Sequence, residues 1–360
     1  MARYEGIGPV QNSATPIGGV TAYLLFGDDM TRLILTTDDS GGGSLKRAGL
    51  ADIVLPFGFR FVWGPLLSAA EIATLLAPRS VKHDSIGSHW LDFEDRRYLE
   101  AIGVKDLGLI DVCERCETIE LWVDPDPNSQ LVLVWLLDYL RPHAKIIPRL
   151  TLVQADAATG GHGPEHVAAW RLPAVKIRND HLEQASAAWR AYRAPTPENW
   201  FNLLSRDLSI LPNLRRAVIK LLEELPMRAT GLGATQMRML QLLSEGIVNP
   251  IALFPHHRHQ RKVFGYWEAG SLLDGLAHCP APAVSGLGEG PFTEEMHDHR
   301  SRHQRYKESR LSLTALGEAI LTWTEDFSRH NPIFRWWGGT RLTNDSLCRW
   351  DPRYRTLIEP

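Results

Sequence analysis

The chain has 360 residues, of which 44% are hydrophobic and 22% are charged, and this composition is typical of a folded globular protein. Its 39 Lys and Arg residues nearly balance 42 Asp and Glu residues, so the formal net charge of -3 gives no overall attraction for nucleic acid. Four Cys residues are too few for a disulfide scaffold. We read neither a signal peptide nor an apolar run of about 18 residues. The sequence therefore predicts a cytoplasmic protein with no membrane partner.

Strand-like and helix-like segments alternate along the first part of the chain. The predicted strands are the apolar runs at residues 20–26, 32–37, 53–57, 119–123 and 147–154. The predicted helices lie at residues 44–49, 69–76, 93–102 and 129–140. This alternation favours an α/β domain with a mainly parallel sheet over residues 1–157.

The rest of the chain is predicted to form two further domains. Residues 158–228 read as a helical connector, with helices at 181–192, 196–206 and 213–225. Residues 229–360 read as a winged-helix-like α+β domain. Its predicted elements are helices at 234–244 and 267–277, a strand at 311–313, a helix capped by Thr314, and a hairpin-like wing that turns at Gly338-Gly339. The Pro/Gly-rich and charged segment 281–310 is expected to be its least ordered part.

A series of short motifs follows one another in a characteristic order. Asp38-Asp39-Ser40 leads into glycines and Ser-Leu-Lys-Arg-Ala, the turn Trp63-Gly64-Pro65-Leu66 follows, and residues 119–122 precede the helix that contains Gln130. This order resembles the amino-terminal domain of a bacterial family called "domain of unknown function 1835". The family has no activity to transfer, so the resemblance implies an architecture and no mechanism.

The carboxy-terminal motifs resemble the domain that often follows that one. They include Leu313-Thr314 with Gly317, and Arg335-Trp336 with Gly338-Gly339. The resemblance spans about residues 30–355. This chain departs from the pattern where Asp38 replaces a usual Gly and where residues 57–62 replace an acidic stretch.

The best candidate ligand site joins a predicted strand to a predicted helix. It comprises Asp38, Asp39, Ser40, Gly41, Gly42, Gly43 and Ser44. Such a turn lies where open α/β sheets bind ligands, and glycines and free N–H groups at a helix start can hold an anion. The two carboxylates oppose an anion unless a cation intervenes, although Lys46 and Arg47 could compensate. The alternative is a tight turn in which Asp or Ser only caps the helix.

Two other segments of the first part carry reactive side chains. His83, Asp84 and His89 could act as an acid–base group, or could belong to a solvated loop. Cys113 and Cys116 form a lone CxxC without a second pair, so we read ordinary cysteines and predict no metal site. The sequence identifies no cofactor.

Basic and aromatic residues mark a candidate nucleic-acid surface in the last part. The residues that would contact phosphates are Arg300, Arg302, Arg305, Lys307 and Arg310, together with the run 256–262. Tyr306 could stack on a base. The alternative is a solvated, charged loop. Similarly, the Trp and Arg residues of 323–350 could form a stacking face or a packed core.

Three functions fit these features. The chain could be a regulatory protein whose α/β domain binds a small anionic ligand and whose winged helix contacts DNA or protein. It could be an enzyme that acts on a phosphorylated or nucleotide-like small molecule at residues 38–44. The winged helix could also serve protein contact alone, which the near-neutral charge favours. Fold analogy does not choose among them.

Overall fold

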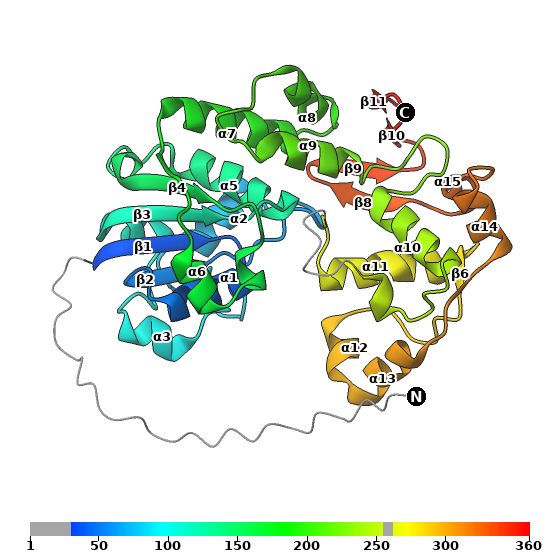
Figure 1. The fold of residues 1–360 in the computed structure, drawn as a ribbon, viewed down its shortest axis with the longest axis horizontal. Helices are drawn as coiled ribbons and strands as arrows, with labels where there is room; N and C mark the ends of the chain where they lie inside the picture. The colour runs from blue at the N-terminus through cyan, green and yellow to red at the C-terminus, as the bar shows by residue number, and fades with distance from the viewer. Residues whose placement is uncertain (1–29, 255–261) are drawn as a thin grey trace.

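The computed structural model describes residues 30–254 and 262–360, and a five-stranded sheet forms the core of its first part (Figure 1). The strand order is β2-β1-β3-β4-β5. The strands are β1 (Met30–Thr36), β2 (Ile53–Pro56), β3 (Cys116–Val123), β4 (Leu150–Gln154) and β5 (Ala174–Lys176). All neighbours pair in parallel except β5, which runs antiparallel to β4. The predicted α/β part with a mainly parallel sheet is thus confirmed.

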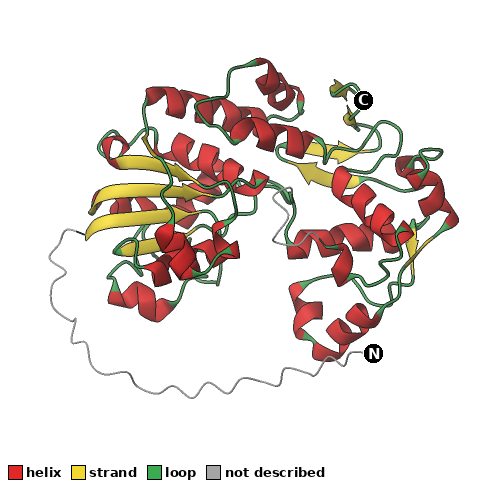
Figure 2. Cartoon of the chain, viewed as in Figure 1, coloured by secondary structure: helices red, strands yellow, loops and turns green. Residues whose placement is uncertain are grey.

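Helices cover both faces of this sheet (Figure 2). The helices up to α9 are α1 (Asp39–Ala48), α2 (Ala69–Leu76), α3 (Arg96–Ala101), α4 (Leu109–Glu114), α5 (Pro127–Leu140), α6 (Pro164–Ala169), α7 (Asn179–Tyr192), α8 (Glu198–Asn202) and α9 (Leu214–Leu222). Of these, α8 packs on α7 and α9 packs on α5, so neither covers the sheet directly. Short 3-10 turns occur at Ile147–Arg149, Thr159–Gly161 and Leu203–Ser205.

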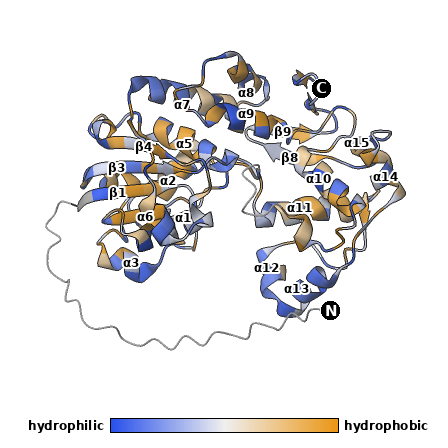
Figure 3. Ribbon diagram, in the orientation of Figure 1, coloured by the Kyte–Doolittle hydropathy of each residue, from blue (hydrophilic) through white to orange (hydrophobic). Residues whose placement is uncertain are grey.

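Alternate residues of each strand point to opposite faces, as the pleat requires. Ile34 of β1 packs with Leu45 of α1 and Val167 of α6 in one apolar cluster. Its neighbours Leu33 and Leu35 belong to a larger cluster on the other face, which includes the buried residues of α5. Figure 3 shows hydrophobic colours along α5, whereas the strands mix hydrophobic and hydrophilic residues. The first part is therefore a three-layer sandwich.

Helix α1 begins earlier than the sequence suggested. We expected a helix over residues 44–49 after a glycine-rich loop, whereas α1 starts at Asp39. The carboxylate of Asp38 accepts a hydrogen bond from the Gly41 amide at 2.8 Å and so caps the helix. The three glycines consequently lie in the first two turns of α1. The predicted strand at 20–26 lies outside the described residues.

The segment predicted as a helical connector also supplies a strand and a packed helix to the first part of the molecule. Its β5 is the edge strand of the sheet, and α7 packs on α5. The three predicted helices correspond to α7, to α8 with the turn after it, and to α9.

The last part combines helices with three small antiparallel sheets of two strands each. The helices are α10 (Ala234–Ser244), α11 (Tyr266–Ala277), α12 (Glu294–Asp298), α13 (Arg300–Glu308), α14 (Ala315–Leu321) and α15 (Phe327–His330), with a 3-10 turn at Ile251–Leu253. The strands are β6 (Val284–Ser285), β7 (Ser312–Leu313), β8 (Phe334–Trp337), β9 (Thr340–Thr343), β10 (Arg349–Asp351) and β11 (Thr356–Ile358). The winged-helix arrangement stays a prediction.

Two local predictions in this part are confirmed. Thr314 caps α14 by accepting a hydrogen bond from the Gly317 amide at 3.1 Å. Strands β8 and β9 form an antiparallel hairpin that turns at Gly338-Gly339. Trp337 of this hairpin is buried, so it packs inward and does not offer a stacking face.

The segment 281–310, which we expected to be the least ordered of this part, is not irregular throughout. This segment contains β6, α12 and α13. Met296 and Tyr306 are fully buried and attach the two short helices to the rest of the part, although Figure 3 shows both helices in mainly hydrophilic colours. Val284 and Phe292 of the same segment are buried as well, so apolar side chains along its length pack it against the rest of this part. Within the described residues, no helix has the length and apolar character needed to cross a membrane.

Candidate functional site

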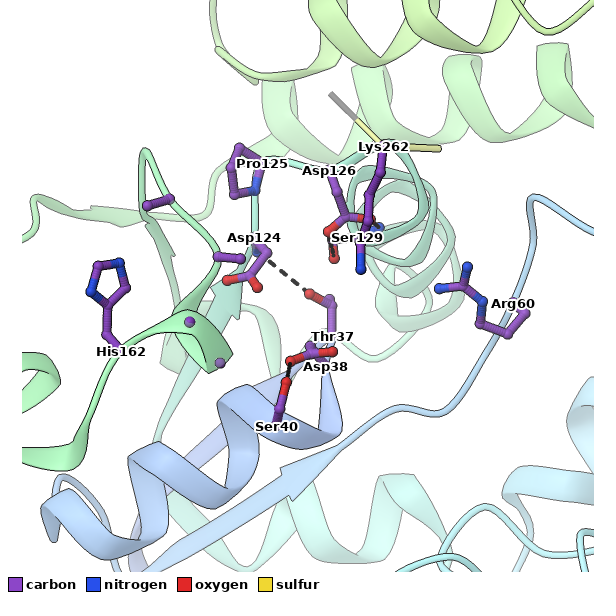
Figure 4. Close-up of a pocket in the computed structure, with 14 residues that line it drawn as sticks. Thr37, Asp38, Ser40, Arg60, Asp124, Pro125, Asp126, Ser129, His162 and Lys262 are labelled. Atoms are coloured by element: carbon purple, nitrogen blue, oxygen red, sulfur yellow. Dashed lines mark hydrogen bonds between the residues drawn. The ribbon is translucent and has the colours of Figure 1, made fainter. Parts of the chain in front are cut away.

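A cavity of about 470 Å³ lies at the carboxyl edge of the parallel sheet (Figure 4). Strands β1 and β3 are neighbours, but the chain leaves β1 toward β2 on one side and reaches β3 on the other. Such a reversal of strand order opens a crevice, and open α/β sheets bind their ligands there. The lining residues are Thr37, Asp38, Ser40, Arg60, Asp124, Pro125, Asp126, Ser129, Ala157, Ala158, Gly160, Gly161, His162 and Lys262.

The turn after β1 supplies the first carboxylate. Asp38 accepts hydrogen bonds from the Ser40 hydroxyl and from the Gly41 amide. A Cβ at Gly42 would lie 3.3 Å from Pro56 of β2, and a Cβ at Gly41 would lie 3.3 Å from Thr159. These glycines therefore let α1 pack closely on its neighbours, and they do not face the cavity.

The turn after β3 supplies two more carboxylates. Asp124 is 2% exposed and accepts hydrogen bonds from the hydroxyl and amide of Thr159 at 2.6 and 3.0 Å. Asp126 caps α5 by accepting from the Ser129 amide at 3.1 Å. Both helices that begin at the cavity are thus capped by carboxylates of the chain, and these caps already use N–H groups that an anion would need.

Burial changes the protonation of Asp124. Loss of hydration raises the pKa of its carboxyl to about 7, and the negative charges of Asp126 and Asp38 act in the same direction. The hydrogen bonds from Thr159 oppose this rise. At neutral pH the group therefore exchanges a proton readily, as a general acid or base must.

The turn after β4 forms another wall of the cavity. A Cβ at Gly160 would collide with the hydroxyl of Ser40 and would lie 2.7 Å from Asp38 Oδ2, so only glycine fits there. The ring of His162 packs edge-on against Trp170, with the ring centroids 5.1 Å apart. In Figure 4, Asp124 lies between this histidine and Asp38.

Two basic side chains lie on the side of the cavity opposite His162. Arg60, in the loop after β2, points its guanidinium group toward the cavity in Figure 4, and Lys262 lies nearby. Arg60 Nε donates to Glu268 Oε1 of α11 at 2.7 Å. The cavity thus combines an acidic floor with a basic rim and suits a polar ligand.

The structure distributes the predicted residues 38–44 between the cavity and the protein interior. Asp38 and Ser40 line the cavity. Ser44 donates its hydroxyl to His162 O at 3.0 Å, and Gly43 lies near the side chain of Arg47. Burial, aided by the charges of Asp38 and Glu94, raises the pKa of Asp39. Lys46 pairs with Glu94 at 2.5 Å, outside the cavity lining.

The His83 loop does not join this cavity. His83 Nδ1 accepts from the Ser80 amide at 3.0 Å, and its Nε2 therefore donates to Thr74 O at 2.8 Å. His89 is buried beside Arg79, and burial together with that positive charge lowers its pKa to about 4. Asp84 is exposed. The polar groups of this loop hydrogen-bond mainly to one another, and none of His83, Asp84 and His89 lines the cavity that Asp38 and Ser40 line.

The five predicted phosphate-contacting residues lie on or next to α13. Arg302 and Arg305 both pair with Glu289, through Nε donors at 3.1 and 2.7 Å. Arg300, Lys307 and Arg310 are exposed. The predicted base-stacking role of Tyr306 is wrong, because its ring is fully buried against Phe292, with the centroids 4.7 Å apart. Residues 256–261 lie outside the described part.

The CxxC cysteines are buried and unoxidised. Burial raises the pKa of Cys113 well above its usual range and that of Cys116 to about 11, so neither supplies a reactive thiolate at neutral pH. In residues 30–254 and 262–360, no group of three or more His, Cys, Asp or Glu side chains is arranged to hold a metal ion.

Sequence reasoning missed Asp124, Asp126, Thr159, Gly160 and Arg60 as site residues. A signal for three of them was present, because Asp124 directly follows a predicted strand and Thr159-Gly160 follows the next one. Comparison with protein-family models gives no match to this chain, and comparison with curated proteins gives none either. The likeness to "domain of unknown function 1835" therefore stays a prediction.

Proposed function

We propose that this chain is a regulatory binding protein that takes a small polar ligand in the cavity at the β1–β3 edge. The observation that carries the proposal is the position of a 470 Å³ cavity at the reversal point of a parallel sheet. Its floor bears hydrogen-bond acceptors. A carboxylate can accept about four hydrogen bonds, and Asp38 accepts two within the chain. Hydroxyl or amine groups of a ligand would complete this set.

The last part of the chain is proposed to respond to the ligand. Helices α10 and α11 followed by the antiparallel pair β6–β7 support the winged-helix prediction. Of the basic residues on α13, Arg302 and Arg305 share the carboxylate of Glu289, which offsets one of their two positive charges; this disfavours a long polyanion and favours a protein partner.

Binding can be tested by calorimetry and thermal unfolding with a panel of sugars, sugar phosphates, nucleotides and amino acids. Asp38→Asn keeps a good helix cap but removes a charge from the cavity, and it should weaken the best-binding compound about tenfold because a charged acceptor is lost. Asp95→Asn is the matched control, since Asp95 caps α3 in the same way away from the cavity. Equal affinities in both variants, or no compound that binds, would contradict the proposal.

An enzyme acting on a phosphorylated or nucleotide-like molecule is the second candidate. The raised pKa of Asp124, at about 7, favours it because this carboxyl can exchange a proton inside the cavity. Turnover of a bound compound that is abolished by Asp124→Asn would establish this function. Binding without chemical change in the wild-type protein would leave the first proposal.

A further inference from the structure

Arg60 is the direct link between the cavity and α11. Its side chain is 43% exposed and lines the cavity, while its Nε donates to Glu268 Oε1 at 2.7 Å. Glu268 is 8% exposed, so this end of the pair is largely removed from water. The guanidinium group of arginine carries five N–H donors, and the bond to Glu268 uses the one on Nε. The exposed end of Arg60 therefore keeps donors that can bind a ligand in the cavity.

Glu268 also fixes the start of α11. Its second oxygen, Oε2, accepts a hydrogen bond from the Gly265 amide at 2.8 Å, which satisfies one of the N–H groups that a helix start leaves open. A Cβ at Gly265 would lie 3.2 Å from Arg60 Nη2, so the backbone of this turn approaches the guanidinium closely. One carboxylate therefore holds both Arg60 and the first turn of α11.

The loop that carries Arg60 is attached on both sides. Asn128 of α5 donates to Phe59 O at 2.8 Å, which ties the loop to the helix that Asp126 caps. Trp63 packs edge-on against Phe264, with the centroids 5.7 Å apart, which ties the loop to the segment that precedes α11. A change at Arg60 is thus transmitted to α11 through direct contacts.

We propose that the cavity ligand carries an anionic group that binds Arg60, and that this group competes with Glu268 and so couples occupancy of the cavity to the N-terminus of α11. This inference rests on the proposed ligand-binding function. The charges of the other lining residues indicate where in the cavity the anionic group would bind. The floor is acidic and both helix starts there are already capped, so Arg60 at the rim, with Lys262 nearby, is where an anion meets positive charge.

The test compares ribose 5-phosphate with ribose, using calorimetry on the full chain. Glu268→Gln removes the competing charge and keeps an oxygen that can accept from the Gly265 amide. This variant should bind ribose 5-phosphate about fivefold more tightly than the wild-type protein does. Arg60→Gln should bind it about tenfold more weakly. Ribose should bind all three proteins equally. Glu100→Gln, which removes the same charge from the exposed end of α3, should leave both affinities unchanged.

Hydrogen exchange gives a second measurement that does not depend on the variant folding well. Ribose 5-phosphate should speed amide exchange at residues 265–269 in the wild-type protein, because Glu268, which accepts from the Gly265 amide, would lose the ion pair with Arg60 that holds its carboxylate in place. Unchanged exchange there, or equal affinity in the wild-type and Glu268→Gln proteins, overturns the coupling. Failure of ribose 5-phosphate to bind overturns the anion site, whereas binding of any neutral compound from the panel would still support the cavity as a binding site.

Discussion

Two regions of the α/β part collect polar side chains, namely the cavity at the sheet edge and the loop of residues 79–92. In the loop, Asp92 accepts hydrogen bonds from Arg79, Gly87 and His89, all within 13 residues of it. In the cavity, Asp124 accepts hydrogen bonds from Thr159, which lies 35 residues away in the turn that follows β4. The carboxylate of the loop bonds only to groups close to it in sequence, whereas Asp124 is held by a group that follows a different strand, and the ends of these strands surround a shared space. The second arrangement leaves room for a ligand.

The two regions should respond to pH with opposite sign. Asp124 has its pKa raised to about 7 in the folded state, so the folded protein holds a proton that the unfolded chain releases near pH 4. Stability from this group is fully present below pH 4 and is lost as the pH rises to about 7. Asp124→Asn removes this loss, and its unfolding free energy relative to wild type should rise by up to roughly 4 kcal/mol between pH 4 and pH 8.

Denaturant unfolding at a series of pH values measures this difference. Asp95→Asn serves as the control, because Asp95 accepts a hydrogen bond from the Tyr98 amide at a helix start away from the cavity. A stability difference between wild type and Asp124→Asn that does not change with pH would mean that the carboxyl is not held protonated by its surroundings.

Adjacent glycines provide a steric test of the cavity. Gly160→Ala should destabilise the protein by about 2 kcal/mol, because its Cβ would collide with Ser40 and crowd Asp38. Gly161→Ala meets nothing within 4 Å and should change stability by less than about 0.5 kcal/mol. Thermal unfolding of both variants would show the contrast, and equal effects would disprove the close approach of this turn to α1.

The loop gives the smallest expected effect. Burial and the positive charge of Arg79 lower the pKa of His89 to about 4 in the folded protein. The unfolded chain therefore binds a proton on this side chain near pH 6.5, whereas the folded protein binds it only near pH 4. Stability from this group is present above pH 6.5 and is lost as the pH falls toward 4. His89→Gln should reduce this acid-induced loss by about 1 kcal/mol in denaturant titrations. The exposed His299→Gln should follow the wild-type curve, and a His89→Gln curve that does the same would contradict the burial argument.

Hydrophobic periodicity was sufficient to predict the elements with one clear apolar face. Helices α2 and α10 have the predicted bounds, and strands β1 to β4 overlap the predicted ones, whereas β5 lies in a segment that is predicted to be helical. Periodicity failed where single contacts decide the structure. Nothing in residues 281–310 distinguishes Met296 and Tyr306 as anchors before the surrounding helices are known, so their ordering effect was not foreseen.

The site could be predicted only as far as one strand end. Asp38 and Ser40 follow a strand and precede a helix, which indicated the right edge of the sheet. Asp124 and Gly160 required the strand order as well, because the β1–β3 and β3–β4 adjacencies bring their turns next to that of Asp38. Arg60 gave no signal, since its role depends on Glu268, a residue 208 positions away.

The hairpin formed by β8 and β9 has a consequence for synthesis of the chain. Its Gly339 amide donates to Tyr192 O at 2.9 Å, and Trp337 Nε1 donates to Leu221 O at 2.8 Å, so it covers α7 and α9. A ribosome that has completed α9 has yet to make more than 100 residues before this cover exists. During that time Tyr192 and Trp200, both buried in the finished protein, lack the ring of Trp337 that packs on them. The aromatic cluster around Tyr192 and Trp200 can therefore be completed only after the chain has been made up to Trp337.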